Sequence, residues 1–227
     1  INEVLLFENK SKQEKTKIID KLLKNPKIKN DWLNYNREIK NMIQFTKVCY
    51  RLQTPVIDDK ISGGDLDLYK IFLERTLQLL KHDGYMGYVI PNGLEIDLNC
   101  TDLRKHIINS TKINSFYDFE NRNPTIFENV HPEFRLIILI IQNTGVGTNS
   151  FSAAFHKNDP ARLREISREA LDYPVNIIPK FSPDTYTIIN FNNEKEVILA
   201  KKIYKHHLMT DDVNEKEWQV KWQNEFH

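Results

Sequence analysis

The chain has 227 residues, of which 40% are hydrophobic and 11% aromatic, so it holds enough apolar material for a packed core and is not disordered throughout. Its 32 Lys and Arg against 31 Asp and Glu give a net charge of +1, so bulk charge indicates neither a nucleic-acid binder nor a binder of acidic lipids. Two cysteines and no apolar run near the roughly 18 residues that span a bilayer predict a cytoplasmic protein with no membrane partner.

Residues 8–50 predict two helices with lysine-rich polar sides. Ser11 and Glu14 have the spacing of a capping box at the start of the first helix, and Pro26 follows its end. The second helix is expected to begin near Asn30, where apolar residues start to recur at helical spacing. The lysines form either a solvated surface or a flank that contacts phosphates.

Residues 60–143 combine helical and strand patterns. An amphipathic helix begins after Asp65, and Gly84 is expected to end it by supplying a left-handed residue. The apolar run from Tyr85 to Ile90 lacks clean alternation, which predicts a strand buried on both faces. A helix over 102–109 and strands over 113–119 and 135–142 complete the pattern of an α/β sheet covered by helices.

The chain changes character at the tract 143–150, where glycines stand among Thr, Asn and Ser. This tract predicts a linker, with a domain boundary at about residue 147. The elements expected beyond it are strands at 151–156, at 175–181 and around Trp218, Val220 and Trp222, and helices that begin at Asp159 and Asn193.

Several common catalytic motifs are absent from the sequence. The seven glycines spell neither G-x-G-x-x-G nor a Walker-type phosphate loop, and there is neither an H-E-x-x-H zinc motif nor a G-x-S-x-G nucleophile elbow. The sequence therefore predicts no metal ligands.

Weaker motifs follow one another in a characteristic order. They are the helix segment Leu68-Tyr69-Lys70-Ile71-Phe72-Leu73-Glu74, the turn His82-Asp83-Gly84, the strand Gly87-Tyr88-Val89-Ile90-Pro91-Asn92, and Ile126-Phe127-Glu128-Asn129-Val130-His131 before the apolar strand 136–141. In this order they resemble the second half of the catalytic domain of DNA methyltransferases that methylate adenine at N6. Within that family, the pattern is most similar to the single-chain enzymes of type IIG restriction-modification and BREX-like phage-defence systems.

The resemblance implies an architecture. The fold would be α/β, with the C-terminal half of a Rossmann-like methyltransferase sheet and flanking helices, followed by a small α+β segment. Residues 1–59 would be a helical insert, residues 60–147 the second half of the catalytic domain, and residues 148–227 the start of a target-recognition or connecting region.

The resemblance also implies a reaction. The parent protein would transfer the methyl group of S-adenosylmethionine to an adenine flipped out of double-stranded DNA. In the family, an Asn/Asp-Pro-Pro-aromatic loop orients N6, and that loop should precede this chain. None of the nine prolines has a proline neighbour. We therefore expect a fragment without catalytic residues and without activity when isolated.

Two positions, Phe72 and Phe127, match functional ones by resemblance, and three further residues are candidates from their place in the chain. Phe72 would pack against the adenine of the cofactor, although its helical spacing also fits a core residue. Phe127, in a loop, would meet the flipped base, and a core position is the alternative for this residue as well. His131 and Arg135 would contact the DNA backbone, and Asn92 follows a strand at the edge where open α/β sheets bind ligands.

A different class of function remains open. The lysine-rich residues 8–50 also fit a noncatalytic module that binds DNA or a protein partner on an α/β scaffold. The coding sequence upstream of this chain would distinguish the two, since only a methyltransferase needs the Asn-Pro-Pro-aromatic loop. Half a sheet would expose an apolar edge, so the isolated fragment is expected to form a homodimer.

Overall fold

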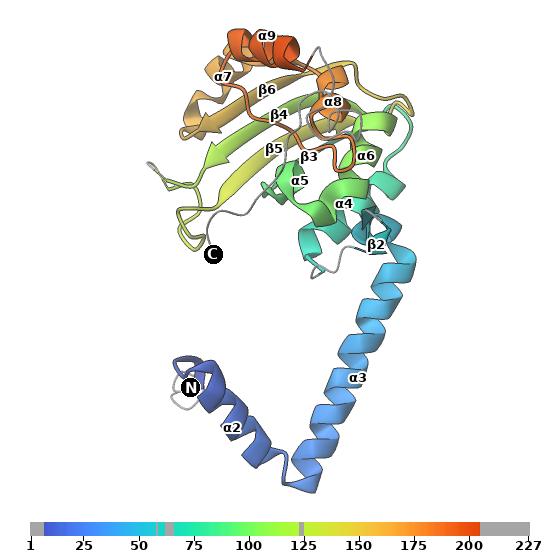
Figure 1. Ribbon diagram of the computed structural model, residues 1–227, viewed down its shortest axis with the longest axis vertical. Coiled ribbons are helices and arrows are strands. Elements are labelled where there is room, and N and C mark those ends of the chain that lie inside the picture. The colour runs from blue at the N-terminus through green and yellow to red at the C-terminus, as the bar shows by residue number, and fades with distance from the viewer. Residues whose placement is uncertain (1–6, 58, 62–65, 123–124, 205–227) are drawn as a thin grey trace, which may run out of the picture. The chain divides into compact units, whose positions relative to one another are not determined.

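A computed structural model of the chain describes residues 7–57, 59–61, 66–122 and 125–204 (Figure 1). The chain divides into two compact units, Ile1–Cys49 and Tyr50–His227. In the described ranges, no helix is both long and apolar enough to cross a membrane.

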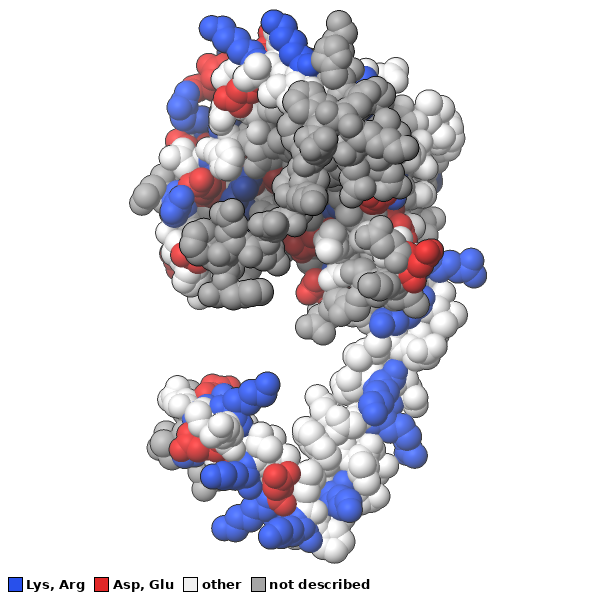
Figure 2. All heavy atoms as spheres, in the orientation of Figure 1, with Lys and Arg blue, Asp and Glu red and all other residues white. Residues whose placement is uncertain are grey.

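The described part of the first unit contains the helices α2 (Lys12–Leu22) and α3 (Pro26–Cys49). The predicted capping box is present: the Glu14 amide donates to the Ser11 hydroxyl at 3.4 Å, and the Ser11 amide donates to the Glu14 carboxylate at 3.0 Å. Helix α3 begins at Pro26 rather than near Asn30, because the Asn25 side chain accepts the Lys27 amide at 3.0 Å and proline is favoured at a first helical position. On the face drawn in Figure 2, Lys and Arg side chains occur along both helices.

The second unit begins with short elements and then forms a mixed α/β layer. Its first part contains η1 (Arg51–Gln53), β1 (Val56–Ile57), β2 (Lys60–Ile61), α4 (Leu68–Leu79), β3 (Tyr85–Pro91), α5 (Gly93–Ile96), η2 (Leu98–Cys100) and α6 (Thr101–Ser110). Its second part contains β4 (Lys112–Glu120), β5 (Arg135–Gln142), β6 (Ser150–Lys157), η3 (Pro160–Arg162), α7 (Leu163–Glu169), β7 (Leu171–Pro174), η4 (Val175–Ile177), α8 (Ile178–Phe181) and α9 (Glu194–Ile203).

The main sheet has five strands in the order β3-β5-β4-β6-β7. β5 lies antiparallel between β3 and β4, β6 runs parallel to β4, and β7 is antiparallel to β6. The predicted α/β class, a sheet with flanking helices, is therefore confirmed. The sheet continues past residue 147, where a domain boundary was expected, because β6 and β7 belong to it.

The core lies mainly on one face of the sheet. There the buried side chains of α4, α5 and α6 pack against those of the strands, and the shared cluster includes Leu73, Leu94, Leu103, Ile107, Met86, Ile90, Ile137, Leu139, Phe116 and Tyr173. A smaller cluster on the other face joins Tyr117 and Phe119 to Ile166 of α7.

The expectation that β3 is buried on both faces is wrong. Met86 and Ile90 are buried, but Tyr85 and Val89 are 63% and 55% exposed. β3 is an edge strand of the described sheet, and only one of its faces is covered. An apolar run does not distinguish a strand covered on both faces from a strand covered on one face. Residues such as Gly87 and Val89 occur in strands of either kind.

Three other local predictions need correction or lie outside the described residues. The left-handed residue after α4 is Asp83 (φ 59°) and not Gly84, and α4 ends at Leu79. Residues 175–181 form helical turns, since Pro179 cannot donate to a strand ladder but fits the first turn of α8. Asp65 and the predicted strand at Trp218, Val220 and Trp222 are not among the described residues.

A buried arginine fixes the segment that follows β3. Arg104 of α6 is 1% exposed and donates to the carbonyls of Leu94 (2.8 Å), Asp97 (3.3 Å) and Thr185 (3.0 Å). Burial lowers the pKa of Arg104 to about 10. The guanidinium thereby ties α5 to Thr185, which is 81 residues from Arg104 along the chain.

Candidate functional site

Three strands end at the same edge of the sheet. β3, β4 and β6 run in one direction, because β5 is antiparallel to both β3 and β4 and β6 is parallel to β4. Their carboxyl ends place Asn92, Asn121 and His156 at this edge, and β5 starts from it at Arg135. Open α/β sheets bind ligands at such an edge, which makes it the candidate site.

Asn92 occupies the turn from β3 into α5. Its amide donates to the Arg135 carbonyl at 3.1 Å, its carbonyl accepts the Glu95 amide at 2.8 Å, and its side chain makes no capping bond. The turn is tightly packed at Gly93, where a Cβ atom would lie 2.5 Å from the Tyr69 hydroxyl and closer still to the Asp97 carboxylate. The half-buried Asn92 amide is therefore held in place by its backbone, with its side chain available.

Phe127 lies in the loop between β4 and β5, and one buried side chain holds this loop. The Asn121 Oδ1 atom accepts the amides of Ile126 (3.0 Å) and Phe127 (2.8 Å), and its Nδ2 atom donates to the carbonyls of Phe127 (3.0 Å) and Val130 (2.7 Å). Asn121 is fully buried, whereas Phe127 is 44% exposed. The core reading of Phe127 is thus excluded, and its ring is presented to solvent by a fixed backbone.

His131 is exposed in the same loop. Its side chain is 63% exposed, its Nδ1 atom accepts the Glu133 amide at 3.3 Å, and its ring lies edge-on to Phe134 with centroids 6.5 Å apart. These contacts orient the imidazole without burying it, so it remains accessible to a partner.

Arg135 belongs to a buried charge cluster. Its Nε atom donates to both carboxylate oxygens of Asp118, at 3.0 and 3.1 Å, and its Nη2 atom lies 3.6 Å from Glu95 Oε2. Asp118 also accepts the amide of His156 at 2.9 Å, and His156 has a left-handed backbone (φ 55°). The guanidinium is therefore largely committed within the protein, with 22% of the side chain exposed.

Glu95 is the unusual acid of this cluster. Its pKa is raised to about 7, first by burial and second by the charge of Asp118, against the opposing effect of Arg135. Within the described part of the chain, Glu95 Oε2 and Asn190 Oδ1 are buried and accept no hydrogen bond. Glu95 is thus poised to hold a proton near neutral pH.

Phe72 lies on α4 and is not a core residue. Its side chain is 60% exposed, while Leu73 beside it is fully buried. The structure joins Asn92 to Arg135 through the backbone and groups Phe127 with His131 in one loop. Phe72 stands on a different element from these four residues.

Sequence reasoning did not identify Asn121, Asp118 and Glu95 as part of this edge. A signal existed for Asp118, because a carboxylate inside the apolar strand Phe116-Tyr117-Asp118-Phe119 needs a buried cation. The position of Asn121 directly after that strand was a weaker signal, since Asn is also common in plain turns.

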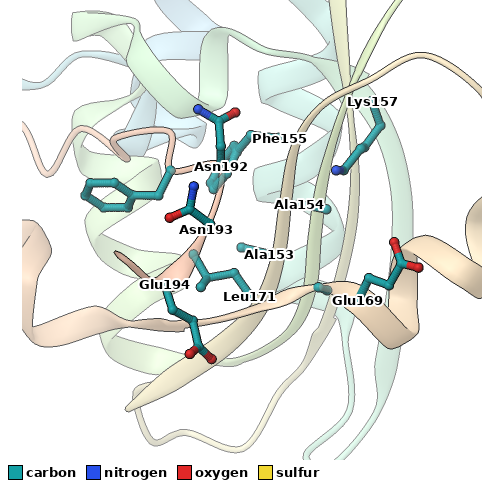
Figure 3. A pocket seen from close by; sticks show the side chains of 11 residues that line it. Ala153, Ala154, Phe155, Lys157, Glu169, Leu171, Asn192, Asn193 and Glu194 are labelled. Carbon is teal, nitrogen blue, oxygen red and sulfur yellow. The ribbon is translucent and has the colours of Figure 1, made fainter. Parts of the chain in front are cut away.

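A separate pocket of about 270 Å³ lies beside the end of β6 (Figure 3). Lys157 and Glu169 reach it from one part of the chain and Asn192, Asn193 and Glu194 from another. None of the five sequence-predicted residues lines it. Among the described residues, no group of three or more His, Cys, Asp or Glu is placed to hold a metal ion.

Comparison with known families gives a match over the middle of the chain. Residues 53–127 match the family described as Eco57I restriction-modification methylase. This segment carries the sequence features of a restriction-modification methylase, and it includes Phe72, Asn92, Asn121 and Phe127. No curated protein matches the chain.

Solved structures give weaker similarities. A chain from a structure of the type I R-M system is 11% identical, with a TM-score of 0.43, and the match covers 68% of this chain and 40% of that one. A modification subunit of a type I restriction enzyme from Vibrio vulnificus YJ016 is 13% identical, with a TM-score of 0.41 and coverages of 68% and 43%. The EcoKI M protein is 8% identical, with a TM-score of 0.44 and coverages of 69% and 48%. The chain spans less than half of each, and these similarities are too weak to assign a function.

Proposed function

We propose that the chain is the downstream part of a DNA methyltransferase that methylates adenine at N6, in a type IIG restriction-modification or BREX-like system. The observation that carries the proposal is the match of residues 53–127 to a restriction-modification methylase family. In this proposal residues 1–59 are a helical insert, residues 60–147 complete the catalytic domain, and residues 148–227 lead into target recognition.

The exposed loop ring supports a role in holding the target base. Adenine N6 is a poor nucleophile whose lone pair is delocalised, so the base must leave the duplex and be held in line with the methyl donor. Phe127 offers an exposed ring on a backbone fixed by Asn121, and stacking one base contributes about 1–3 kcal/mol. His131, from the same loop, would contact the DNA backbone.

The other proposed positions have narrower roles. Asn92 follows β3 at the carboxyl edge with a free side-chain amide, which fits a contact to the target nucleotide. Arg135 is held by Asp118, so its contact with DNA would use only the exposed fifth of its side chain.

The cofactor proposed is S-adenosylmethionine, which supplies the methyl group. One feature of this chain supports a cofactor contact. The ring of Phe72 on α4 is exposed, whereas a core residue would be buried. An aromatic face suits the cofactor's adenine. The groups that orient N6 would come from an Asn-Pro-Pro-aromatic loop that this sequence does not contain. We therefore expect the isolated chain to be inactive.

The decisive experiment measures transfer of radiolabelled methyl groups to duplex DNA, followed by mass analysis of the nucleosides. The isolated chain and a longer protein encoded with the upstream sequence are compared. We expect N6-methyladenine only with the longer protein, with Phe127→Ala strongly impaired and Phe127→Tyr, which keeps the ring, close to wild type. Methylation by the isolated chain would contradict its proposed inactivity, and failure of the longer protein on every DNA would contradict the function.

Partners and location follow from the same proposal. Double-stranded DNA is the partner of the whole protein, no membrane partner is expected, and the site of action is the cytoplasm.

We also propose that the isolated chain forms a homodimer through the β3 edge, where Tyr85 and Val89 are exposed. Light scattering should give a dimeric mass that Val89→Lys reduces to the monomer, and a monomeric wild type at high concentration would contradict it.

A second candidate function is a noncatalytic DNA- or protein-binding module. The lysine-rich helices α2 and α3 favour it, because they lie outside the segment that matches the methylase family. Reading the parent gene upstream separates the two candidates. An Asn-Pro-Pro-aromatic coding run supports the methyltransferase, and its absence supports the module.

A further inference from the structure

Positive charge is concentrated in one of the two units. Residues 7–49 contain 11 Lys and Arg but 5 Asp and Glu, a net charge of +6, although the whole chain has a net charge of +1. The rest of the chain therefore carries a net charge of −5. The net charge of the whole chain is near zero because a strongly basic pair of helices is joined to a mildly acidic α/β unit.

Among the described residues, the Lys and Arg side chains of α2 and α3 form no ion pair with an acidic residue. All the ion pairs found in the described part of the chain lie in the second unit, and none involves a Lys or Arg of α2 or α3. Lys17, Lys21, Lys29 and Lys40 are exposed, and Lys47 is partly exposed. Uncompensated like charges repel one another, so a surface of this kind gains most from a polyanion.

The lysines of α3 form a row. Lys29, Lys40 and Lys47 are separated by 11 and 7 residues, which at 3.6 residues per turn places them within about 20° of one side of the helix. The row is about 27 Å long at 1.5 Å per residue. Helix α3 has no Gly, and its one Pro is the first residue, so the row stands on an unbroken rod. Lys17 and Lys21 of α2 are likewise one turn apart on a shared side.

We propose that α2 and α3 form a docking surface for the phosphate backbone of double-stranded DNA, with the Lys29, Lys40 and Lys47 row as its main contact. Duplex DNA carries one charge per about 1.7 Å of its axis, so a row of this length faces several phosphates. Lysine contacts phosphate as a point charge and reads no base, so the surface adds affinity without sequence preference.

An anionic membrane is the other polyanion to consider, and α3 fits it less well. A helix that lies in a membrane surface has one apolar side. On α3 the exposed Leu33 lies about 40° around the helix from the lysine row, and the exposed Phe45 lies about 160° from it. The exposed apolar residues of α3 are therefore not confined to one side opposite the lysines. The choice of DNA also rests on the proposed function, because residues 53–127 match a DNA-modifying family.

The test compares two triple variants of the full chain. One is Lys29→Gln, Lys40→Gln and Lys47→Gln. The matched control removes the same charge from the exposed lysines of α9 in the other unit, as Lys195→Gln, Lys201→Gln and Lys202→Gln. Fluorescence anisotropy of labelled duplexes with unrelated sequences measures affinity between about 50 and 200 mM salt. Circular dichroism checks that both variants keep their helices.

We expect the α3 variant to bind every duplex at least about tenfold more weakly and to lower the slope of log K against log salt by up to about 2.7, or 0.9 per lost phosphate contact. The α9 variant should stay within about twofold of wild type. Equal losses in both variants, or no loss in the α3 variant, would overturn the proposal. Binding to phosphatidylserine vesicles but not to DNA, lost in the α3 variant, would overturn it in favour of a membrane.

The outcome is separable from that of the proposed function. The α3 surface predicts that the α9 variant keeps the salt dependence of wild type, because its three lysines belong to the other unit. DNA binding through α3 in a protein that never methylates would retain this inference and refute the methyltransferase. If the longer protein methylated DNA and the α3 variant bound DNA as tightly as wild type, the methyltransferase function would be retained and this inference would be refuted.

Discussion

Arg135, the first residue of β5, holds the buried carboxylate of Asp118 on the neighbouring strand β4. Its Nε atom lies 3.0 Å from Oδ1 and 3.1 Å from Oδ2, and Asp118 is completely buried. A buried carboxylate without a cation is strongly destabilising, so this pair is needed for the edge to keep its shape.

Loss of this arginine should therefore destabilise the protein. We expect Arg135→Gln to lower the free energy of unfolding by about 3–5 kcal/mol at neutral pH, because Asp118 would be left as an unpaired buried charge. Arg122→Gln is the control, since Arg122 and its Glu120 partner lie near the surface, where solvent screens the pair and its loss should change stability little. Urea denaturation measures both, and equal effects would show that Asp118 does not depend on Arg135.

Stability should fall as pH rises through the titration of Glu95. Its pKa is raised from 4.5 to about 7, so between these values the folded protein keeps a proton that the unfolded chain has lost. The stabilisation is complete below about pH 4.5 and is lost by about pH 7, a change on the order of 3 kcal/mol.

The variant Glu95→Gln tests this titration. The neutral amide has nearly the same shape and does not titrate, so the variant should be more stable than wild type at pH 8 and less sensitive to pH between 5 and 8. Glu128→Gln, at an exposed acid, should leave the pH profile unchanged. Parallel profiles for wild type and Glu95→Gln would show that Glu95 titrates normally.

Asn121 should govern the order of the loop that carries Phe127. Asn121→Asp keeps the acceptor for the amides of Ile126 and Phe127 but turns an oxygen toward the carbonyls of Phe127 and Val130, and Asn121→Ala removes all four bonds. We expect a loss of about 1–3 kcal/mol for each, with hydrogen exchange at the amides of 126 and 127 becoming faster.

Asn143→Ala is the matched control for this loop. Asn143 also donates its side-chain amide to a backbone carbonyl, that of Leu80 at 2.8 Å, but it follows the opposite end of β5. Its substitution should lower stability without selective exchange at 126 and 127. If both variants had the same exchange pattern, the loop would depend only on global stability.

The turn after β3 should not tolerate a side chain at Gly93. A methyl group there would meet the Tyr69 hydroxyl at 2.5 Å, and that hydroxyl is fixed by Cys100 at 3.5 Å. We expect Gly93→Ala to cost about 1–3 kcal/mol. Gly87→Ala, which meets no atom within 4 Å, should be neutral or stabilising. Thermal unfolding compares the two, and a neutral Gly93→Ala would mean that the turn can open.

Sequence patterns were sufficient where a local rule decides the structure. The capping box at Ser11, the helix of α4, and the strands β3, β4 and β5 follow from spacing and apolar content within a few residues. The helical turns at 175–181 were missed because an apolar run is ambiguous between strand and helix, and only Pro179 favours the helix.

The site was predictable only in part, because its members meet through long-range packing. Phe127 stood out as an aromatic residue in a polar loop, and the structure leaves its ring exposed. Asn121 and Glu95 could not be found in the same way, since their importance comes from burial beside residues of other elements. Whether Arg135 is free or paired likewise depends on Asp118, which is 17 residues away.

The position of β3 in the sheet has a consequence for how the chain acquires its fold. β4 and β5 are consecutive strands that can pair as soon as both exist. Among the strands that the structure describes, β3 pairs only with β5, and Tyr85 meets Gln142 across 57 residues of chain. Closing the longer loop is slower, and synthesis proceeds from the N-terminus. On the ribosome, β3 and its Pro91–Asn92 turn must therefore wait for β5 to emerge, and a chain interrupted before residue 135 would leave Met86 and Ile90 without a sheet to cover them.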